Sequence, residues 1–176
     1  YEITVKANSA TATYDGKEHE AVGVETYEFT VEGNSYTVSG LSTEDPKQKD
    51  AGSYTNNITG TPVVTDKEGN VVTSEFEVKT ENGSLEIGKA AVTLKSATLS
   101  KKYDGNALVN GDTALEVESG FAEGEGATYN FTGSQTVVGS SANAFSYELN
   151  SNTNIDNYAI SKQEGTLTVT NREAKY

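Results

Sequence analysis

Short runs in which apolar and polar residues alternate recur along the whole chain. A period of two is that of a β-strand with one buried face. Turns rich in Gly, Asn and Ser separate the runs. The runs in the first half are Ile3/Val5, Val22/Val24, Tyr27/Phe29/Val31, Tyr36/Val38, Val71/Val72, Phe76/Val78 and Leu85/Ile87. Those in the second half are Val92/Leu94, Leu115/Val117, Tyr129/Phe131, Phe145/Tyr147/Leu149, Tyr158/Ile160 and Leu167/Val169. The pattern predicts a mainly β protein.

The segment from Ser42 to Lys49 departs from this pattern and favours a short helical turn. Ser42 has a side chain that can cap the start of a helix. Glu44 and Asp45 would lie in its first turn, where negative charge is favourable.

An internal repeat sets the domain organisation. The strand-like run Ile3 to Lys6 precedes Tyr14-Asp15-Gly16, and Val92 to Lys95 precedes Tyr103-Asp104-Gly105 at the same spacing. Near the ends, Phe76, Val78, Gly83, Leu85 and Ile87 match Tyr158, Ile160, Gly165, Leu167 and Val169. Such self-similarity predicts two homologous modules, residues 1–88 and 89–170, with residues 171–176 beginning a linker to a following module. The connection around Lys89 is too short for a free tether, so we expect an elongated, monomeric rod.

Composition narrows the range of partners. The formal net charge is −13, which disfavours binding to nucleic acid or to an anionic membrane surface. Cys is absent, so neither a disulfide nor a thiolate site is available. Continuous apolar runs of ~18 residues are also missing, so we expect no membrane insertion. Because the chain opens at Tyr1 with no Met, we expect it to be a piece of a longer polypeptide.

The order of these motifs resembles the MBG or YDG-type repeats of Firmicute surface proteins. The match is strongest at Lys102 to Gly105, Gly120 to Tyr129, Thr132 to Thr136 and Asn157 to Val169. In the first module it rests on Thr13 to Gly16, Asp50 to Tyr54 and Gly83 to Ile87. The resemblance implies β-grasp-like or immunoglobulin-like modules repeated along wall-attached adhesin stalks, in an extracellular, Gram-positive setting. It supplies no catalytic residue.

Candidate catalytic residues are sparse. His19 is the sole histidine and lies in a polar run, so we interpret it as a solvated loop residue rather than a general base. Glu25, Glu28 and Glu32 fit a solvated strand face better than a glycosidase pair. The glycine-rich segment Gly120 to Gly126 lacks the lysine of a phosphate-binding loop and is interpreted as a mobile turn. We therefore expect no enzymatic activity and no cofactor.

Three further features bear on binding. Asp66, Glu68 and Asn70 are weak calcium candidates because their oxygens alternate, but they lack a distal bidentate Glu. A hairpin turn with Gly69 at a positive φ accounts for the same residues and is preferred. Asn152, Asn154 and Asp156 are weaker still. Tyrosines at strand positions predict core or cross-strand packing rather than a sugar platform: Tyr27, Tyr36, Tyr129, Tyr147 and Tyr158. Neither Lys6 nor Lys95 can be paired with an isopeptide acceptor from sequence.

The repeated Tyr-Asp-Gly motif is expected to be structural. Asp and Gly favour a tight turn, and the preceding tyrosine, Tyr14 or Tyr103, should pack its ring into the module. The resemblance and the repeat make a stalk or spacer that projects a functional head from the cell wall the leading functional expectation, with neighbouring repeats as its partners. The alternative is an adhesive module that recognises host protein or glycan, through a strand edge or the segment Gly40 to Tyr54.

Overall fold

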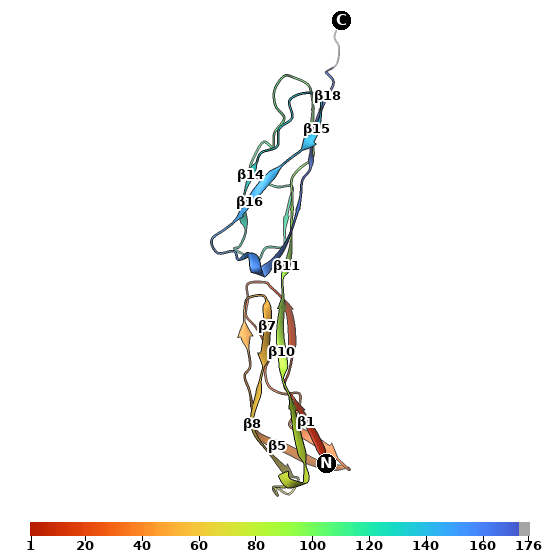
Figure 1. Ribbon diagram of the computed structural model, residues 1–176, viewed down its shortest axis with the longest axis vertical. Coiled ribbons are helices and arrows are strands. Elements are labelled where there is room, and N and C mark those ends of the chain that lie inside the picture. Colours follow the sequence, from red (N-terminus) through yellow and green to blue (C-terminus); the bar gives the residue numbers. More distant parts are fainter. Residues whose placement is uncertain (173–176) are drawn as a thin grey trace. The chain divides into compact units, whose positions relative to one another are not determined.

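The computed structural model describes residues 1–172 (Figure 1). Strands make up 55% of it and helix 3%, arranged in several small sheets rather than a barrel, which confirms a mainly β protein. The chain divides into two compact units, one ending at Gly88 and the next beginning at Lys89. Asn171 and Arg172 follow the last strand without regular structure, and the rest of the expected linker, residues 173–176, lies outside the described residues.

Unit 1 contains ten strands and one short 3-10 helix. The strands are β1 (Glu2–Lys6), β2 (Ala10–Thr13), β3 (His19–Glu20), β4 (Glu28–Val31), β5 (Asn34–Thr43), β6 (Lys47–Gln48), β7 (Gly52–Asn56), β8 (Ile58–Asp66), β9 (Glu77–Glu81) and β10 (Gly83–Gly88), with η1 (Thr73–Glu75) before β9.

Over its described residues, 89–172, unit 2 contains eight strands and a second 3-10 helix. They are β11 (Ala90–Lys95), β12 (Leu99–Lys102), β13 (Val117–Ser119), β14 (Ala127–Phe131), β15 (Gly139–Ala142), β16 (Phe145–Leu149), β17 (Tyr158–Gln163) and β18 (Thr166–Thr170), with η2 (Ile155–Asn157) before β17.

In each unit the strands that begin the unit pair in parallel with those that end it. In unit 1, β1 pairs with β9 so that Ile3 lies beside Val78, and β2 pairs with β10 so that Ala10 lies beside Leu85. We call β1 and β2 the entry strands of unit 1, and β9 and β10 its exit strands. β7 adds an antiparallel neighbour on the other side of β10 (Figure 1).

Unit 2 repeats this arrangement at the matched positions. Its entry strands β11 and β12 pair in parallel with its exit strands β17 and β18, with Val92 beside Ile160 and Leu99 beside Leu167. β15 runs antiparallel to β18, as β7 does to β10. These matched positions therefore form equivalent rungs: Ile3 with Val78 corresponds to Val92 with Ile160, and Ala10 with Leu85 corresponds to Leu99 with Leu167.

Alternation along these strands produces the cores. Ile3, Val5, Leu85 and Ile87 are buried in unit 1, while the residues between them face outward. Six further residues complete the buried apolar core of unit 1: Ala7, Tyr14, Ala21, Val38, Ile58 and Val64. The buried apolar side chains of unit 2 include Val92, Leu94, Phe145, Tyr158, Leu167 and Val169. Burying each of the larger side chains contributes about 1.5–3 kcal/mol, so the paired strands carry much of the stability.

Some expected elements are not present as expected. The helical turn from Ser42 to Lys49 is wrong, because β5 continues through Thr43 and Lys47 already belongs to β6. Asp45 between them has a φ of 54°, outside the helical region, and its carboxylate accepts hydrogen bonds from Gly23 N and Thr43 Oγ1. The runs at Val22/Val24 and Val71/Val72 form single bridges rather than strands.

A buried asparagine lies beside the break between the entry strands of each unit. Asn56 Nδ2 donates to Asn8 O at 3.0 Å, and Asn143 Nδ2 donates to Ala97 O at 3.0 Å. Both side chains are fully buried. Asn56 Oδ1 also accepts from Asp45 N, whereas Asn143 Oδ1 is buried without a partner. A buried amide of this kind compensates for backbone groups that the ladder leaves unpaired.

We expect Asn56→Ala to destabilise unit 1 by about 1–3 kcal/mol, because Asp45 N–H and Asn8 C=O would each lose a partly buried hydrogen bond and a fully buried side chain would be removed. Urea unfolding measures this change. Asn34→Ala, at the exposed start of β5, is the matched control and should stay within about 0.5 kcal/mol. Equal unfolding midpoints for the two variants would contradict the role assigned to Asn56.

Candidate functional site

The parallel ladders between entry and exit strands form the feature that both units share most closely. In unit 1 the ladder is interrupted after Lys6 and resumes at Ala10; in unit 2 it is interrupted after Lys95 and resumes at Leu99. Side chains accept from the backbone N–H groups exposed by this interruption. Ser9 Oγ accepts from Ser84 N, and Thr98 Oγ1 accepts from Thr166 N.

A second side chain, between the two exit strands of each unit, also accepts a hydrogen bond from a backbone N–H group. Asn82 Oδ1 accepts from Ile58 N at 3.0 Å in unit 1, and Glu164 Oε2 accepts from Phe145 N at 2.9 Å in unit 2. The residue type differs, but each side chain provides an oxygen to the first residue of an earlier strand, Ile58 of β8 or Phe145 of β16. The interruption is therefore a built feature of both ladders, not a local irregularity.

Glycine at the interruption permits close backbone contact. A Cβ on Gly83 would lie 2.1 Å from Asn8 O, and one on Gly165 would lie 2.2 Å from Ala97 O. Both distances are far below van der Waals contact, so only glycine fits without moving the entry strand.

The Tyr-Asp-Gly motif forms a turn at the far end of each entry strand pair. Asp15 Oδ1 accepts from Lys17 N at 2.9 Å, and Asp104 Oδ1 accepts from Asn106 N at 2.9 Å. Gly16 and Gly105 have φ values of 78° and 81°, the left-handed region that glycine tolerates. The hydrogen bond from Lys17 N lowers the pKa of Asp15 below its ordinary value, and that from Lys101 Nζ lowers the pKa of Asp104.

The two tyrosines of the motif differ in burial. Their backbone N–H groups make the same contact, Tyr14 N with Gly88 O and Tyr103 N with Thr170 O, each at 2.8 Å. Tyr14 is only 8% exposed, which confirms that its ring is packed. Tyr103 is 40% exposed, so the expectation that its ring packs into the module is wrong. The motif fixes the backbone of the turn, and the surroundings of each ring determine its burial.

We expect Tyr14→Ala to lower the free energy of unfolding of unit 1 by about 3–5 kcal/mol, the range for loss of a large buried side chain. Tyr103→Ala is the matched control in unit 2 and should cost about 1 kcal/mol or less, because its ring is already partly solvated. Denaturant unfolding followed by NMR resolves the two units. Equal losses of unfolding free energy in the two variants would contradict the link between the burial of each ring and its contribution to stability.

The calcium candidate is a hairpin-like turn that satisfies its own carboxylate. Asp66 Oδ1 accepts from Glu68 N at 3.0 Å and from Asn70 N at 2.8 Å, and Gly69 has a φ of 87°. The bond from Asn70 N lowers the pKa of Asp66 below its ordinary value. Within residues 1–172, no group of three or more His, Asp or Glu side chains is placed to hold a metal ion. Asn154 similarly accepts from Asp156 N at the start of η2.

We expect folding of the chain to be independent of calcium, because the Asp66 carboxylate already holds its own turn. Melting in EDTA and in millimolar calcium measures this directly. The two melting temperatures should agree to within about 4 °C, the shift that corresponds to roughly 1 kcal/mol in a small domain. If calcium raises the melting temperature by more than this, and the rise disappears in Asp66→Ala, Asp66 is a calcium ligand.

The remaining catalytic candidates are held in structural contacts. His19 lies in β3 rather than in a loop, and its Nε2 is 2.8 Å from Asp15 Oδ1. The segment from Gly120 to Gly126 connects β13 to β14, and Ala122 N in this segment donates to Tyr158 Oη. A Cβ on Gly120 would lie 1.9 Å from Ala91 O, which explains a glycine there without a ligand.

Other side chains singled out by the sequence are spread over the strands. Tyr129 lies opposite Tyr147 on β14 and β16, and Tyr36 lies opposite Phe29, as expected for cross-strand packing. Burial raises the pKa of Tyr129, whose hydroxyl donates to Glu118.

Lys6 forms an exposed ion pair with Glu81 at 3.9 Å. An internal isopeptide crosslink would require a buried lysine. Among the described residues, none of the buried polar side chains is a lysine.

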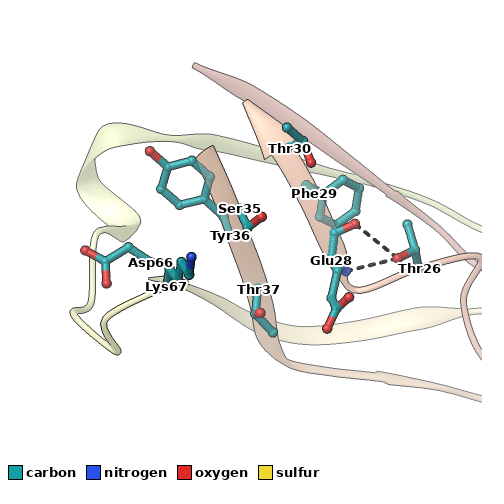
Figure 2. A pocket seen from close by; sticks show the side chains of 9 residues that line it. All are labelled: Thr26, Glu28, Phe29, Thr30, Ser35, Tyr36, Thr37, Asp66 and Lys67. Atoms are coloured by element: carbon teal, nitrogen blue, oxygen red, sulfur yellow. Dashed lines mark hydrogen bonds between the residues drawn. The ribbon is translucent and has the colours of Figure 1, made fainter. Parts of the chain in front are cut away.

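A polar hollow of about 520 Å³ lies beside β4 and β5 of unit 1 (Figure 2). Figure 2 shows Asp66 and Lys67 at one end and Thr26 and Glu28 at the other, where Thr26 Oγ1 bonds with Glu28. The other lining residues are Phe29, Thr30, Ser35, Tyr36 and Thr37. These side chains offer hydroxyl groups and opposite charges but no histidine or thiol to act as a nucleophile or base.

Sequence reasoning missed the residues that hold the ladder interruptions. Asn56 and Asn143 were not singled out, and neither was Ser96, which is fully buried in unit 2. A signal was present, because each asparagine stands two residues before a buried strand residue, Ile58 or Phe145. Aligning the two copies through this pair would have identified both asparagines.

Comparison with known proteins finds no matching family model, no similar protein among curated sequences and no matching solved structure. Among the described residues, the two short 3-10 helices are the only helices, and neither is long and apolar enough to cross a membrane. The geometry of the two units therefore carries the functional argument.

Proposed function

We propose that the chain supplies structural stalk or spacer repeats of a Gram-positive cell-surface protein, attached to the cell wall and projecting a functional head. The observation that carries this proposal is the parallel pairing of entry and exit strands in both units. The sequence resemblance to MBG or YDG-type repeats supports the same assignment.

Parallel pairing determines how a unit responds to tension. The chain enters unit 1 at the beginning of β1 and leaves at the end of β10, at the outer ends of two successive parallel ladders, β1–β9 and β2–β10. Pulling on them slides the strands past each other, so every hydrogen bond of each ladder is loaded together. Pulling the two strands apart at the same end of the ladder would instead break the hydrogen bonds one at a time. The observed geometry is the one that resists extension.

The finer fold follows from the same pairing. We propose that each unit is β-grasp-like, because immunoglobulin sandwiches are built from antiparallel sheets. Successive units then form an elongated, monomeric spacer in which each unit adds length and contacts its neighbours in the chain. On this proposal the chain is not an enzyme and requires no cofactor.

A pulling experiment on unit 1 tests the proposal, and the absence of cysteine allows handles to be placed at chosen positions. Handles at Glu2→Cys and Lys89→Cys load the ladder in shear. Handles at Glu2→Cys and Glu77→Cys load it from one end, because Glu2 and Glu77 are a paired position. We expect the first pair to require a several-fold higher unfolding force in single-molecule measurements. Equal forces for the two pairs would overturn the load-bearing role.

The alternative function is adhesion, and one observation favours it. The hollow beside β4 and β5 is lined by hydroxyl groups and two aromatic rings, Phe29 and Tyr36, which suit a polar ligand such as a host glycan. Titration of unit 1 with glycan mixtures, followed through amide shifts of Thr30 and Thr37, would detect such binding.

A further inference from the structure

Ser96 is a fully buried residue at the interruption of the unit 2 ladder. Its hydroxyl donates to Asn143 O at 2.7 Å and accepts from Gly165 N at 2.9 Å. Its own N–H donates to Gln163 O at 3.1 Å. One side chain thus joins the entry strand, the exit strand and the segment between β15 and β16.

These contacts close into a ring. Ser96 Oγ donates to Asn143 O, Asn143 N donates to Gly165 O at 2.8 Å, and Gly165 N donates to Ser96 Oγ. Each residue of the ring both donates and accepts. Removing the hydroxyl would leave the Gly165 N–H and the Asn143 C=O without this partner in a region closed to water.

Unit 1 has different residues at the corresponding interruption of its ladder. Its matched residues are Ala7, Asn56 and Gly83; Ala7 N donates to Glu81 O just as Ser96 N donates to Gln163 O. Asn56 and Gly83 are themselves a paired position of the β7–β10 ladder. In unit 2 the ladder between β15 and β18 ends one position earlier, at Ala142 and Thr166. The serine hydroxyl takes the place of that final rung.

We infer that Ser96 is a latch that holds the interrupted ladder of unit 2 closed, an arrangement that unit 1 lacks. The inference about unit 2 stability stands on this geometry, and its relevance to tension rests on the proposed function. Residues 96–98 make no ladder pairs with the exit strands, so fewer hydrogen bonds hold the two sides of the ladder together at this point. The hydroxyl bridges that point by accepting from Gly165 N, and its second hydrogen bond, to Asn143 O, fixes both sides to the segment between β15 and β16.

Amide hydrogen exchange of the whole chain tests the latch without reference to function. In Ser96→Ala we expect exchange of the Gly165 amide to accelerate by about ten- to one-hundred-fold, the change that corresponds to losing a buried hydrogen-bond partner. Gly83 in unit 1 should be unaffected. Ser96→Cys keeps the side-chain volume but is a weak hydrogen-bonding group, so it should resemble the alanine variant. Ser100→Ala on β12, an exposed serine, is the matched control.

Unchanged Gly165 exchange in a folded Ser96→Ala protein would overturn the latch. If Ser96→Ala does not fold, Ser96→Thr retains the hydroxyl and Ser96→Cys retains the volume. Protected Gly165 in the threonine variant, with accelerated exchange in the cysteine variant, would support the latch. Equal exchange in those two variants would exclude it.

Pulling on the full chain connects the latch to tension. Ser96→Ala should lower the unfolding force of unit 2 and leave that of unit 1 unchanged, so unit 1 serves as an internal reference. If shear and one-ended pulling of unit 1 require equal force, the proposed function fails while the exchange result still decides the latch. If shear resistance is present and Ser96→Ala leaves the force of unit 2 unchanged, the latch fails and the load-bearing role stands.

Discussion

The parallel pairing of the first and last strands is the constraint on which the rest of each unit depends. Parallel neighbours cannot be joined by a tight turn, so the chain between them must travel back along the unit before pairing. The intervening strands of unit 1, β3 to β8, make this return and bring Val38, Ile58 and Val64 into contact with Ile3 and Val5. The core therefore exists because the two ends of the unit are neighbours.

Both ladders contain an interruption, and the two units satisfy it with different side chains in equivalent positions. Asn82 and Glu164 are chemically distinct, yet each provides an oxygen to one backbone N–H group. Ser9 and Thr98 do the same on the entry side. What the repeat preserves is the hydrogen-bond requirement of the backbone, because a buried unpaired donor costs more than most changes of side chain.

Much of the strand pattern could be predicted from sequence, since alternation reports directly which face of a strand is buried. The strands themselves, the repeat and the Tyr-Asp-Gly turns depend on local residue order and were accessible in this way. Which strands pair was not accessible, because β1 and β9 lie far apart in the sequence. The exposure of the Tyr103 ring could not be predicted in this way, because it depends on neighbours that adjacent residues do not specify. The expected helix at Ser42 failed for a related reason: Asp45 bonds to Gly23, far away in sequence, and this contact overrides local preference.

The position of each unit's two ends also limits how the unit could be reused. Many domains begin and end at nearby points and can be placed inside a loop of another protein or circularly permuted. Here the start of β1 and the end of β10 are separated by the length of the ladder, at about 3.3 Å per residue. A short loop cannot join such ends, so permuted or inserted forms would need a long linker. Serial fusion requires no such linker, and a gene encoding these units can gain or lose whole copies without rebuilding any of them.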